Sequence, residues 1–288
     1  MKLPQSLVVA GLAIVAVGIA VGQTSKPAQI PEIKDKAGNM WVRGFSKMSY
    51  KNLGSNQLKF TVSTLAGKKL LATWAKENIN VEAGGLECLV LLDKDKAYRL
   101  QTATMTGGIA ADFVRASANT ASKEKQTANI RAGSADYEGS KNEVTVRGNV
   151  TLSRSDPGAS QTMNAVGSSG VITLSEQGSA ANAVRAATLN GPVKLTMTGV
   201  RPGEDGKPSK YNLVGNADRM VFDDAKRTIV FTGNVRISGD DPSLGGDISG
   251  VNNATVTLTK NGEIESIELE GDPGKTVVQD KRKGGGGR

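Results

Sequence analysis

A glycine followed two residues later by a β-branched residue recurs at a nearly constant interval along the middle of the chain. The intervals between the four glycines are 41, 43 and 42 residues, and the segments are Gly107-Gly108-Ile109, Gly148-Asn149-Val150, Gly191-Pro192-Val193 and Gly233-Asn234-Val235. A fixed period of this length is the mark of an architecture made of repeated structural units. We therefore predict a chain built from repeats of about 42 residues.

Two of these segments resemble each other over a longer stretch. The stretch that starts at Ala135 and the stretch that starts at Ala217 both begin with Ala-Asp and then pass through a charged turn. Both go on to an alternating run, to Gly-Asn-Val and to Asp-Pro. We interpret the longer stretch as a duplicated unit, of which the shorter period is about half.

Apolar and polar residues alternate inside these units. Successive side chains of a strand point to opposite faces, so this pattern predicts strands with one dry face and one wet face. Antiparallel sheets tolerate such a pattern, whereas parallel sheets are covered on both faces. The residues expected on the dry face are Val144, Val146, Val150, Leu152, Val193, Leu195, Met197, Ile229, Phe231, Val235 and Ile237.

Each repeated glycine lies in the middle of such a pattern, on the apolar parity. A glycine there marks a bend, a bulge or the close approach of another backbone, although the end of a strand is an alternative for any single glycine. Four glycines at equal spacing favour a corner at which the sheet folds over itself. We therefore predict an all-β, antiparallel, folded-over two-layer sheet. A weak helical period appears around residues 70–77, where a short helix would also fit.

The two ends of the chain have a different composition from the middle. Residues 7–22 are apolar and glycine-rich after a single lysine and end in small residues, so residues 1–22 are predicted to be an export signal. A retained anchor in the inner membrane is the alternative. Residues 23–39 are expected to form a linker, and residues 40–134 a β region with weaker repeats. Residues 135–278 are expected to form the main β region, and the basic stretch 279–288 a disordered tail.

The composition also excludes several classes of chemistry. The chain has no histidine, which removes histidine-based triads and histidine metal ligands. Its single cysteine, Cys88, lies in an apolar run and is expected to be a small core residue. The formal net charge of +8 mildly favours anionic partners. We expect no enzymatic activity, no cofactor, no metal site and no nucleic-acid partner.

Together these residues resemble a known family. The pattern is Ala-Asp, a short turn, a strand with Gly-Asn-Val, an Asn-Gly hairpin and a closing Gly-Asp-Pro. It occurs at Ala217-Asp218, Gly233-Asn234-Val235, Asn261-Gly262 and Gly271-Asp272-Pro273. It is similar to the OstA-like domain of the lipopolysaccharide-transport proteins, above all to the periplasmic bridge component. The resemblance covers residues 135–278, and the chain departs from it in its greater length and in Gly191-Pro192-Val193.

The resemblance implies a β-jellyroll that is open along one side and holds the acyl chains of an amphipathic, anionic lipid in an apolar groove. The eleven dry-face residues given above are then the candidates for the groove. It further implies a role in outer-membrane biogenesis in the periplasm, with partners that are other jellyroll components bound through edge strands, or further copies of the chain. A structural or adhesive β-repeat protein of the cell surface without a lipid cargo is the alternative.

Overall fold

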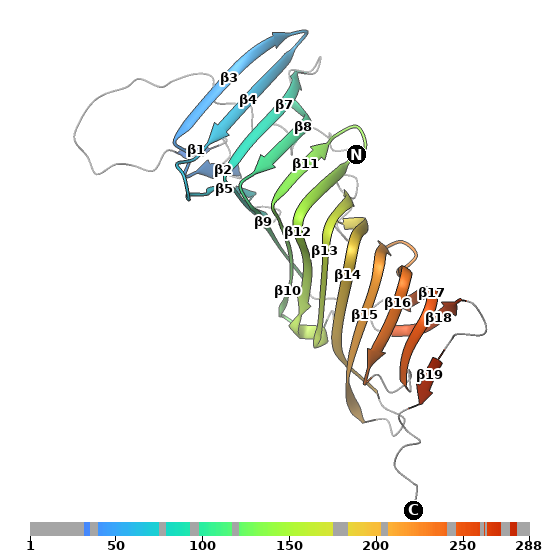
Figure 1. Ribbon diagram of the computed structural model, residues 1–288. Coiled ribbons are helices and arrows are strands. Elements are labelled where there is room, and N and C mark those ends of the chain that lie inside the picture. The colour runs from blue at the N-terminus through green and yellow to red at the C-terminus, as the bar shows by residue number, and fades with distance from the viewer. Residues whose placement is uncertain are drawn as a thin grey trace, which may run out of the picture. The chain divides into compact units, whose positions relative to one another are not determined.

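The structure is a computed structural model, and β-strands dominate it (Figure 1). It describes residues 32–34, 40–74, 79–92, 98–116, 121–174, 184–202, 207–240, 246–259, 262, 264–271 and 277–280. Within these ranges every pairing whose register is defined is antiparallel, which confirms the expected all-β antiparallel class. None of the helices in the described ranges has the length and apolarity needed to cross a membrane.

The strands have the following bounds. They are β1 (Glu32–Lys34), β2 (Met40–Arg43), β3 (Lys47–Gly54), β4 (Gln57–Ser63), β5 (Leu70–Trp74), β6 (Ile79–Ala83), β7 (Gly85–Leu92), β8 (Tyr98–Thr106), β9 (Ile109–Ala116), β10 (Lys125–Ala132), β11 (Ser134–Glu138), β12 (Glu143–Asp156), β13 (Gln161–Leu174), β14 (Val184–Pro202), β15 (Pro208–Asp223), β16 (Thr228–Gly239), β17 (Gly246–Leu258), β18 (Ile264–Glu270) and β19 (Val277–Asp280). A short 3-10 helix, η2 (Pro157–Ala159), follows β12.

The chain divides into two compact units. Unit 1 comprises residues 1–113, 131–146 and 175–182, and unit 2 comprises residues 114–130, 147–174 and 183–288. The domain boundary expected between residues 134 and 135 stays a prediction. The predicted signal segment lies outside the described residues. Strand β1 falls within the stretch expected to be a linker, where it pairs with β2.

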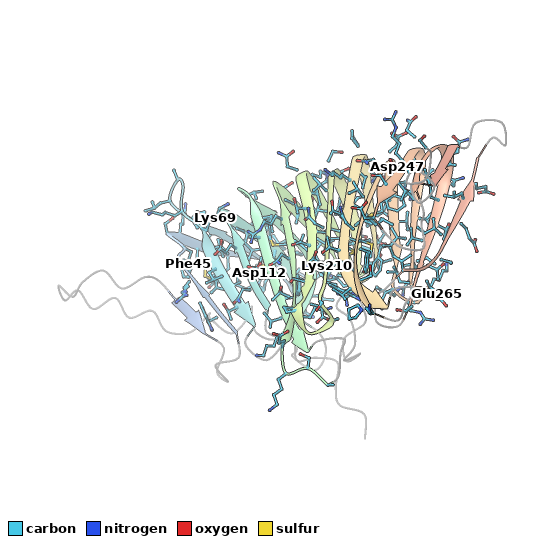
Figure 2. All side chains as sticks on the ribbon, turned by 90° about the horizontal axis from the view of Figure 1, so that it is seen from below. Phe45, Lys69, Asp112, Lys210, Asp247 and Glu265 are labelled. Carbon is cyan, nitrogen blue, oxygen red and sulfur yellow. The ribbon has the colours of Figure 1, made fainter. Side chains whose placement is uncertain are left out.

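Unit 1 is a set of short strands around a small core. Strand β4 lies between β3 and β7, and β7 continues to β8 and β11. Phe60, Cys88 and Ala103 form a buried cluster at the centre of these strands, so the expectation that Cys88 is a core residue is confirmed. Lys69, labelled in Figure 2, donates a hydrogen bond to the carbonyl oxygen of Gly108 at 2.7 Å, in the turn between β8 and β9.

The sequence suggested that a short helix could form around residues 70–77. This expectation is wrong for residues 70–74. Residues 70–74 form strand β5, which pairs with β2 on one side and with β6 on the other. Leu70 and Ala72 are buried while Leu71 between them is partly exposed, which is the period of a strand. Pairing on both sides outweighs the helix propensity of leucine and alanine, because local propensity is a weak preference.

In unit 2 the consecutive strands β13 to β17 pair side by side, and both β18 and β19 pair with β17 (Figure 1). The predicted alternation is confirmed by the burial of the side chains. Nine of the eleven dry-face residues are at most 4% exposed, and these are Val146, Val150, Val193, Leu195, Met197, Ile229, Phe231, Val235 and Ile237. Val144 and Leu152 are partly exposed.

The repeated glycines adopt the left-handed conformation that other residues avoid. Gly107, Gly148, Gly191 and Gly233 have φ angles between +76° and +90°. At Gly191 the ladder between β14 and β15 slips, since two residues of β14 lie opposite one residue of β15. At Gly233 the same happens between β16 and β17. These are β-bulges, so the predicted bend or bulge is confirmed at both positions.

The bulge at Gly233 is held by polar contacts. Asn234, the next residue, has a φ of +50°, a conformation that asparagine tolerates better than most residues. Its side-chain amide donates a hydrogen bond to Asp218 Oδ2 at 2.7 Å. A Cβ atom at Gly233 would lie 2.5 Å from that same carboxylate oxygen, which leaves no room for a side chain.

We expect Gly233→Ala to destabilise unit 2 by about 2–4 kcal/mol, because the new methyl group adds a clash to the cost of the left-handed backbone. Gly67→Ala is the matched control, since Gly67 has a φ of +72° but no atom within 4 Å of an added Cβ atom. In the control variant the free energy of unfolding should fall by only about 1–2 kcal/mol. Urea denaturation of both variants measures the difference, and equal losses would show that the contact with Asp218 does not matter.

Burial gives Cys88 a second testable property. Desolvation and the neighbouring charge of Glu87 raise the pKa of the Cys88 thiol to about 11. Only about one thiol in a thousand is then ionised at pH 8, because each unit between pH and pKa is a factor of ten. We expect Cys88 to react with a disulfide reagent at pH 8 only after the chain is unfolded in guanidinium, and fast reaction of the folded chain would contradict this burial.

Candidate functional site

The bulges divide the strands of unit 2 into two sets of segments, which we call half A and half B. Every defined pairing among strands β13 to β19 joins segments of the same half. Half A consists of residues 161–166, 193–202, 208–217, 235–239, 246–251 and 277–280. Residues 150–156 of β12 are counted with it, because β12 neighbours β13 in the sheet and leads into it through the short turn at helix η2. Half B consists of residues 169–174, 184–190, 219–223, 228–232, 253–258 and 264–270.

A small cavity shows that the two halves face each other. Tyr211 and Phe222 both line this cavity, although they lie eleven positions apart on the same strand, β15. A straight strand would separate them by about 36 Å, at about 3.3 Å per residue. Strand β15 therefore bends between them, at the bulge opposite Gly191, so that its two arms lie on opposite sides of the cavity.

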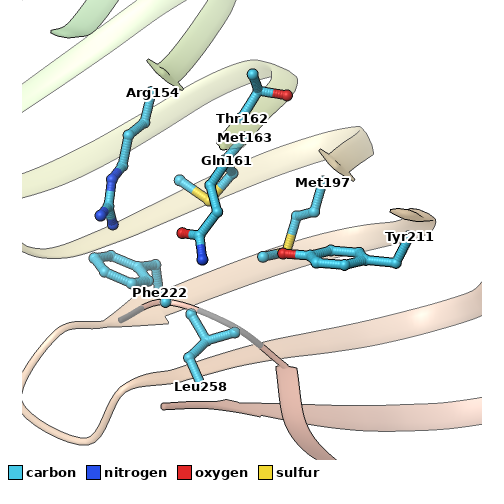
Figure 3. A pocket seen from close by; sticks show the side chains of 9 residues that line it. Arg154, Gln161, Thr162, Met163, Met197, Tyr211, Phe222 and Leu258 are labelled. Atoms are coloured by element: carbon cyan, nitrogen blue, oxygen red, sulfur yellow. The ribbon is translucent and has the colours of Figure 1, made fainter. Parts of the chain in front are cut away.

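The lining of the cavity comes from the outer ends of both halves (Figure 3). Half A contributes Arg154, Gln161, Thr162, Met163, Met197 and Tyr211, and half B contributes Phe222 and Leu258 together with Gly262 of the turn after β17. We call this meeting of strand ends the seam. It lies at the end of the arms that is farthest from the bulges.

Between the bulges and the seam the interior is apolar and closely packed. Leu195, Gly215, Ile237 and Ile248 lie in one row across four strands of half A, each paired with the next. The ring of Phe231 from half B reaches over this row, since a Cβ atom at Gly215 would lie 2.7 Å from its Cζ atom. Glycine at position 215 therefore provides the space that the aromatic ring fills, an arrangement known from other sheets.

The cavity at the seam has a volume of about 30 Å³, which is about the share of one water molecule in the liquid. Ligand sites are usually about ten times larger. Of the eleven groove candidates, Met197 lines this cavity, and the other buried candidates of unit 2 do not line it. The structure thus brings Val150, Val193, Leu195, Met197, Ile229, Phe231, Val235 and Ile237 into one dry interior. The role of the candidates in binding a lipid stays a prediction, and for an acyl chain the halves would have to move apart.

Val144 and Val146 belong to the first part of β12, in unit 1, and are not part of this interior. Leu152 belongs to half A and is partly exposed.

A polar cluster that the sequence analysis missed lies at the seam. Arg154 and Asp156 continue the inward parity of Val150 and Leu152 along β12, so they point to the same face as those apolar residues. Asp156 is completely buried and Gln161, the first residue of β13, is 8% exposed. Charged residues are almost never fully buried unless they are paired. The sequence did hold a signal for this cluster, because the inward positions of β12 continue in alternation from Val150 through Arg154 to Asp156, at the Asp-Pro turn.

Asp156 is satisfied by several partners. Its Oδ1 accepts a hydrogen bond from the backbone N–H of Ala159 at 3.2 Å and so caps helix η2. Its Oδ2 lies 4.0 Å from the Arg154 guanidinium, which is the outer limit of an ion pair. Gln126 on β10 lies against the same pair, and its side-chain amide oxygen accepts a hydrogen bond from Arg154 Nη2 at 2.6 Å. The carboxylate is therefore tied to its own end of half A.

Arg154 also lies within electrostatic reach of the opposite half. Burial lowers the pKa of the Arg154 guanidinium, while the charges of Asp156, Asp224 and Tyr211 act in the opposite direction. Asp224 lies in the turn between β15 and β16, at the seam end of half B. A Cβ atom at Gly262 would lie 3.1 Å from Gln161 Oε1 and 3.7 Å from an Arg154 nitrogen, so the turn after β17 touches the polar cluster. Side chains thus join the two halves at the seam.

Each unit also presents a strand with an unpaired side. In the pairings whose register is defined, β3 of unit 1 pairs with β4 alone, and its Tyr50 and Leu53 are 60% and 45% exposed. By the same criterion β18 and β19 of unit 2 pair with β17 alone. Such edges offer free backbone N–H and C=O groups to another strand.

Comparison with known proteins supports the resemblance. Residues 129–248 match the family described as LptA/(LptD N-terminal domain) LPS transport protein. The match includes Gly148, Gly191 and Gly233 but ends before the Asn-Gly hairpin and the Gly-Asp-Pro segment that also suggested the family. No curated protein matches the chain significantly.

Among solved structures, the chain is similar to LptH, the LptA-homologous periplasmic component of the lipopolysaccharide transport device from Pseudomonas aeruginosa. The sequence identity is 12%, and the alignment covers 53% of this chain and 94% of that one, with a TM-score of 0.38. A likeness of this degree carries no conclusion about function. The family match is the finding that bears on function, and the family is not enzymatic, as expected for this chain. Residues 129–248 of this chain are thus similar to the LptA and LptD N-terminal family of lipopolysaccharide transport proteins.

Proposed function

We propose that this protein binds a lipopolysaccharide-type lipid in the periplasm and passes it on during the assembly of the outer membrane. The observation that carries the proposal is the match of residues 129–248 to a lipopolysaccharide transport family, in a unit whose strands fold over a continuous apolar interior. The acyl chains occupy that interior, between half A and half B. The chain reaches the periplasm through its N-terminal export signal, or stays anchored to the inner membrane by residues 7–22.

The physical basis is the cost of exposing an acyl chain to water. A chain of about a dozen methylene groups exposes apolar surface that costs about 10 kcal/mol, at about 0.8 kcal/mol for each group. A carrier has to cover that surface without binding so tightly that the lipid cannot leave. The walls of unit 2 are mainly valine, isoleucine, leucine and alanine side chains that pack on each other when no lipid is present. Separating the halves breaks this packing, and the free energy lost offsets part of the free energy gained by covering the lipid. The affinity for the lipid therefore stays moderate.

The architecture we propose is a β-jellyroll built from repeats of about 42 residues. The four corner glycines, which recur at that interval and all have positive φ angles, support it. We further propose that the chain joins other jellyroll components, or further copies of itself, by strand addition. The unpaired sides of β3, β18 and β19 support this proposal, because backbone hydrogen bonds across an edge are a common way of extending a sheet.

Titration of the mature chain with a fluorescent fatty-acyl probe and with lipopolysaccharide tests the function. We expect saturable binding of the probe, competition by lipopolysaccharide, and a higher melting temperature with bound lipid, because a ligand of the folded state stabilises it. An intact fold with no detectable binding at about 100 μM would reject the proposal and favour a structural or adhesive surface protein.

A pair of neighbouring variants separates interior binding from surface binding. Met163 is partly buried and lines the cavity, whereas Asn164 is exposed on the opposite face of β13. A tryptophan at position 163 takes up interior space, so Met163→Trp should weaken probe binding by about tenfold or more. Asn164→Trp should leave it unchanged. Equal affinities of the two variants would show that the probe binds outside the interior.

A further inference from the structure

The positive charge of the chain is concentrated in one stretch of its sequence. Residues 36–76 contain eight lysine and arginine side chains and no aspartate or glutamate. The whole chain has 36 cationic and 28 anionic side chains, so the other residues contain 28 of each and carry no formal net charge. The net charge of +8 is therefore the charge of residues 36–76 alone. In unit 1 this stretch contains strands β2 to β5.

Large apolar side chains are exposed in the same stretch. Tyr50 and Leu53 belong to β3, and Leu65 belongs to the loop between β4 and β5, where it is 67% exposed. The fourth exposed large hydrophobic side chain of the described residues, Val166, lies in unit 2. Three of these four side chains are therefore gathered in one part of unit 1. Exposed apolar side chains that occur together mark an interaction site.

Exposed lysines lie beside these apolar side chains. Lys47 and Lys51 are four positions apart on β3, so they point to the same side of the strand. Lys68 is in the loop with Leu65, and its backbone N–H donates a hydrogen bond to the Leu65 carbonyl oxygen at 3.0 Å. Within the described residues none of these three lysines forms an ion pair. Lys59 on β4 differs, since it pairs with a glutamate of β7 at 2.7 Å.

These side chains form one surface along the outermost strand of unit 1 (Figure 1). The loop that contains Leu65 begins beside Lys47, because Lys47 is paired with Ser63, the last residue of β4. Leu53 lies about 20 Å away at the other end of β3, at about 3.3 Å per residue. We call this the β3 surface, and it consists of Lys47, Tyr50, Lys51, Leu53, Leu65 and Lys68.

The chemistry of the β3 surface fits the surface of an anionic bilayer. Lysine carries a compact charge on a flexible stem, without the fixed geometry by which arginine holds a single carboxylate or phosphate. Tyrosine and leucine beside lysine are typical of segments at a membrane surface, where the apolar parts enter the headgroup boundary and the charges stay in water. A protein partner instead takes up apolar anchors in a few central pockets. Leu53 and Leu65 lie at opposite ends of the surface, a spacing that a bilayer accepts because it has no fixed pockets.

From these observations we propose that the β3 surface docks unit 1 onto a bilayer that contains anionic phospholipid. The lysines bind the headgroup phosphates, and Tyr50, Leu53 and Leu65 enter the boundary between the headgroups and the acyl chains. This docking goes beyond the proposed function, because it needs no lipid inside unit 2. Strand addition at β3 would cover the same side chains, so a chain that is docked through β3 cannot be extended at that edge.

The charges are tested with the full mature chain and vesicles of phosphatidylethanolamine and phosphatidylglycerol, and binding is measured by co-sedimentation. Lys47→Gln with Lys51→Gln should weaken vesicle binding by about twentyfold to thirtyfold, at about fivefold for each charge near an anionic membrane. Lys194→Gln with Lys210→Gln is the matched control, because these lysines are exposed on unit 2 and the same net charge is lost. The control should change binding by less than about twofold, since salt screens charges that do not contact the membrane. Equal losses in the two double variants overturn the proposal.

A second pair of variants tests the apolar contact. Leu65→Ser removes an exposed apolar side chain from the β3 surface, and Val166→Ser removes one from unit 2. We expect Leu65→Ser to weaken vesicle binding by about fivefold or more, because burial of the leucine at the membrane is lost. Val166→Ser should leave vesicle binding unchanged. Circular dichroism and urea denaturation identify a variant that has lost its fold, and the other variant of the β3 surface then decides. Unchanged binding of the folded variants of the β3 surface overturns the proposal.

Two further conditions separate docking from other modes of binding. Vesicles of phosphatidylcholine, which have no net charge, should bind the chain far more weakly than the anionic vesicles. Binding to the anionic vesicles should be lost at about 1 M salt, where the Debye length falls to about 3 Å. Equal binding to both kinds of vesicle, or binding that persists at high salt, overturns the proposal.

The combined results also distinguish a second copy of the chain as the partner. A lysine double variant of the β3 surface that binds vesicles like the parent chain but no longer self-associates in sedimentation velocity overturns the proposal in favour of such a partner. Its affinity for the fluorescent fatty-acyl probe should equal that of the parent chain. If the parent chain binds no acyl probe but docks on anionic vesicles through these lysines, the proposed function fails and the docking stands.

Discussion

A strand that is apolar on one face along its whole length needs a second apolar surface to cover that face. In unit 2 the strand supplies the surface itself by bending, so that the dry face of one arm meets the dry face of the other. The bend requires backbone angles that only glycine takes without cost, and Gly191 and Gly233 supply them at bulges. The rest of the unit depends on these corners, because a straight strand would leave half of its apolar residues in water.

The same bend places the weakest part of the interior far from the corners. Near the bulges the ladders hold the chain in register on both arms, and the ring of Phe231 packs on Gly215. At the outer ends no defined ladder of the described strands joins the two arms, and there the packing leaves a cavity and admits an ion pair. The packed interior near the bulges and the cavity at the seam therefore involve different residues of unit 2.

Much of this arrangement follows from local sequence patterns. Alternation predicted the inward face of β14 and β16, and the spacing of the glycines predicted the corners, since both depend on the geometry of a few consecutive residues. The family resemblance came from Ala217-Asp218 and Gly233-Asn234-Val235, which fall inside the matched segment, and from the Asn-Gly and Gly-Asp-Pro segments, which lie beyond it. The strand at residues 70–74 looked partly helical, because its pairing with β2 and β6 is not visible in its own sequence. The seam could not be predicted, because Tyr211 and Phe222 meet only after β15 has bent and Gly262 reaches Gln161 from about a hundred positions away.

The residues at the seam differ in chemistry from those near the bulges. Arg154 and Asp156 share the inward parity of Val150, and a charged pair on an inward face is costly, so a sequence that keeps one is a reason to look for what the pair does. If leucine or methionine replaced the pair and Gln161, the seam would pack more tightly and hold no buried charge, a change that in other proteins is neutral or stabilising.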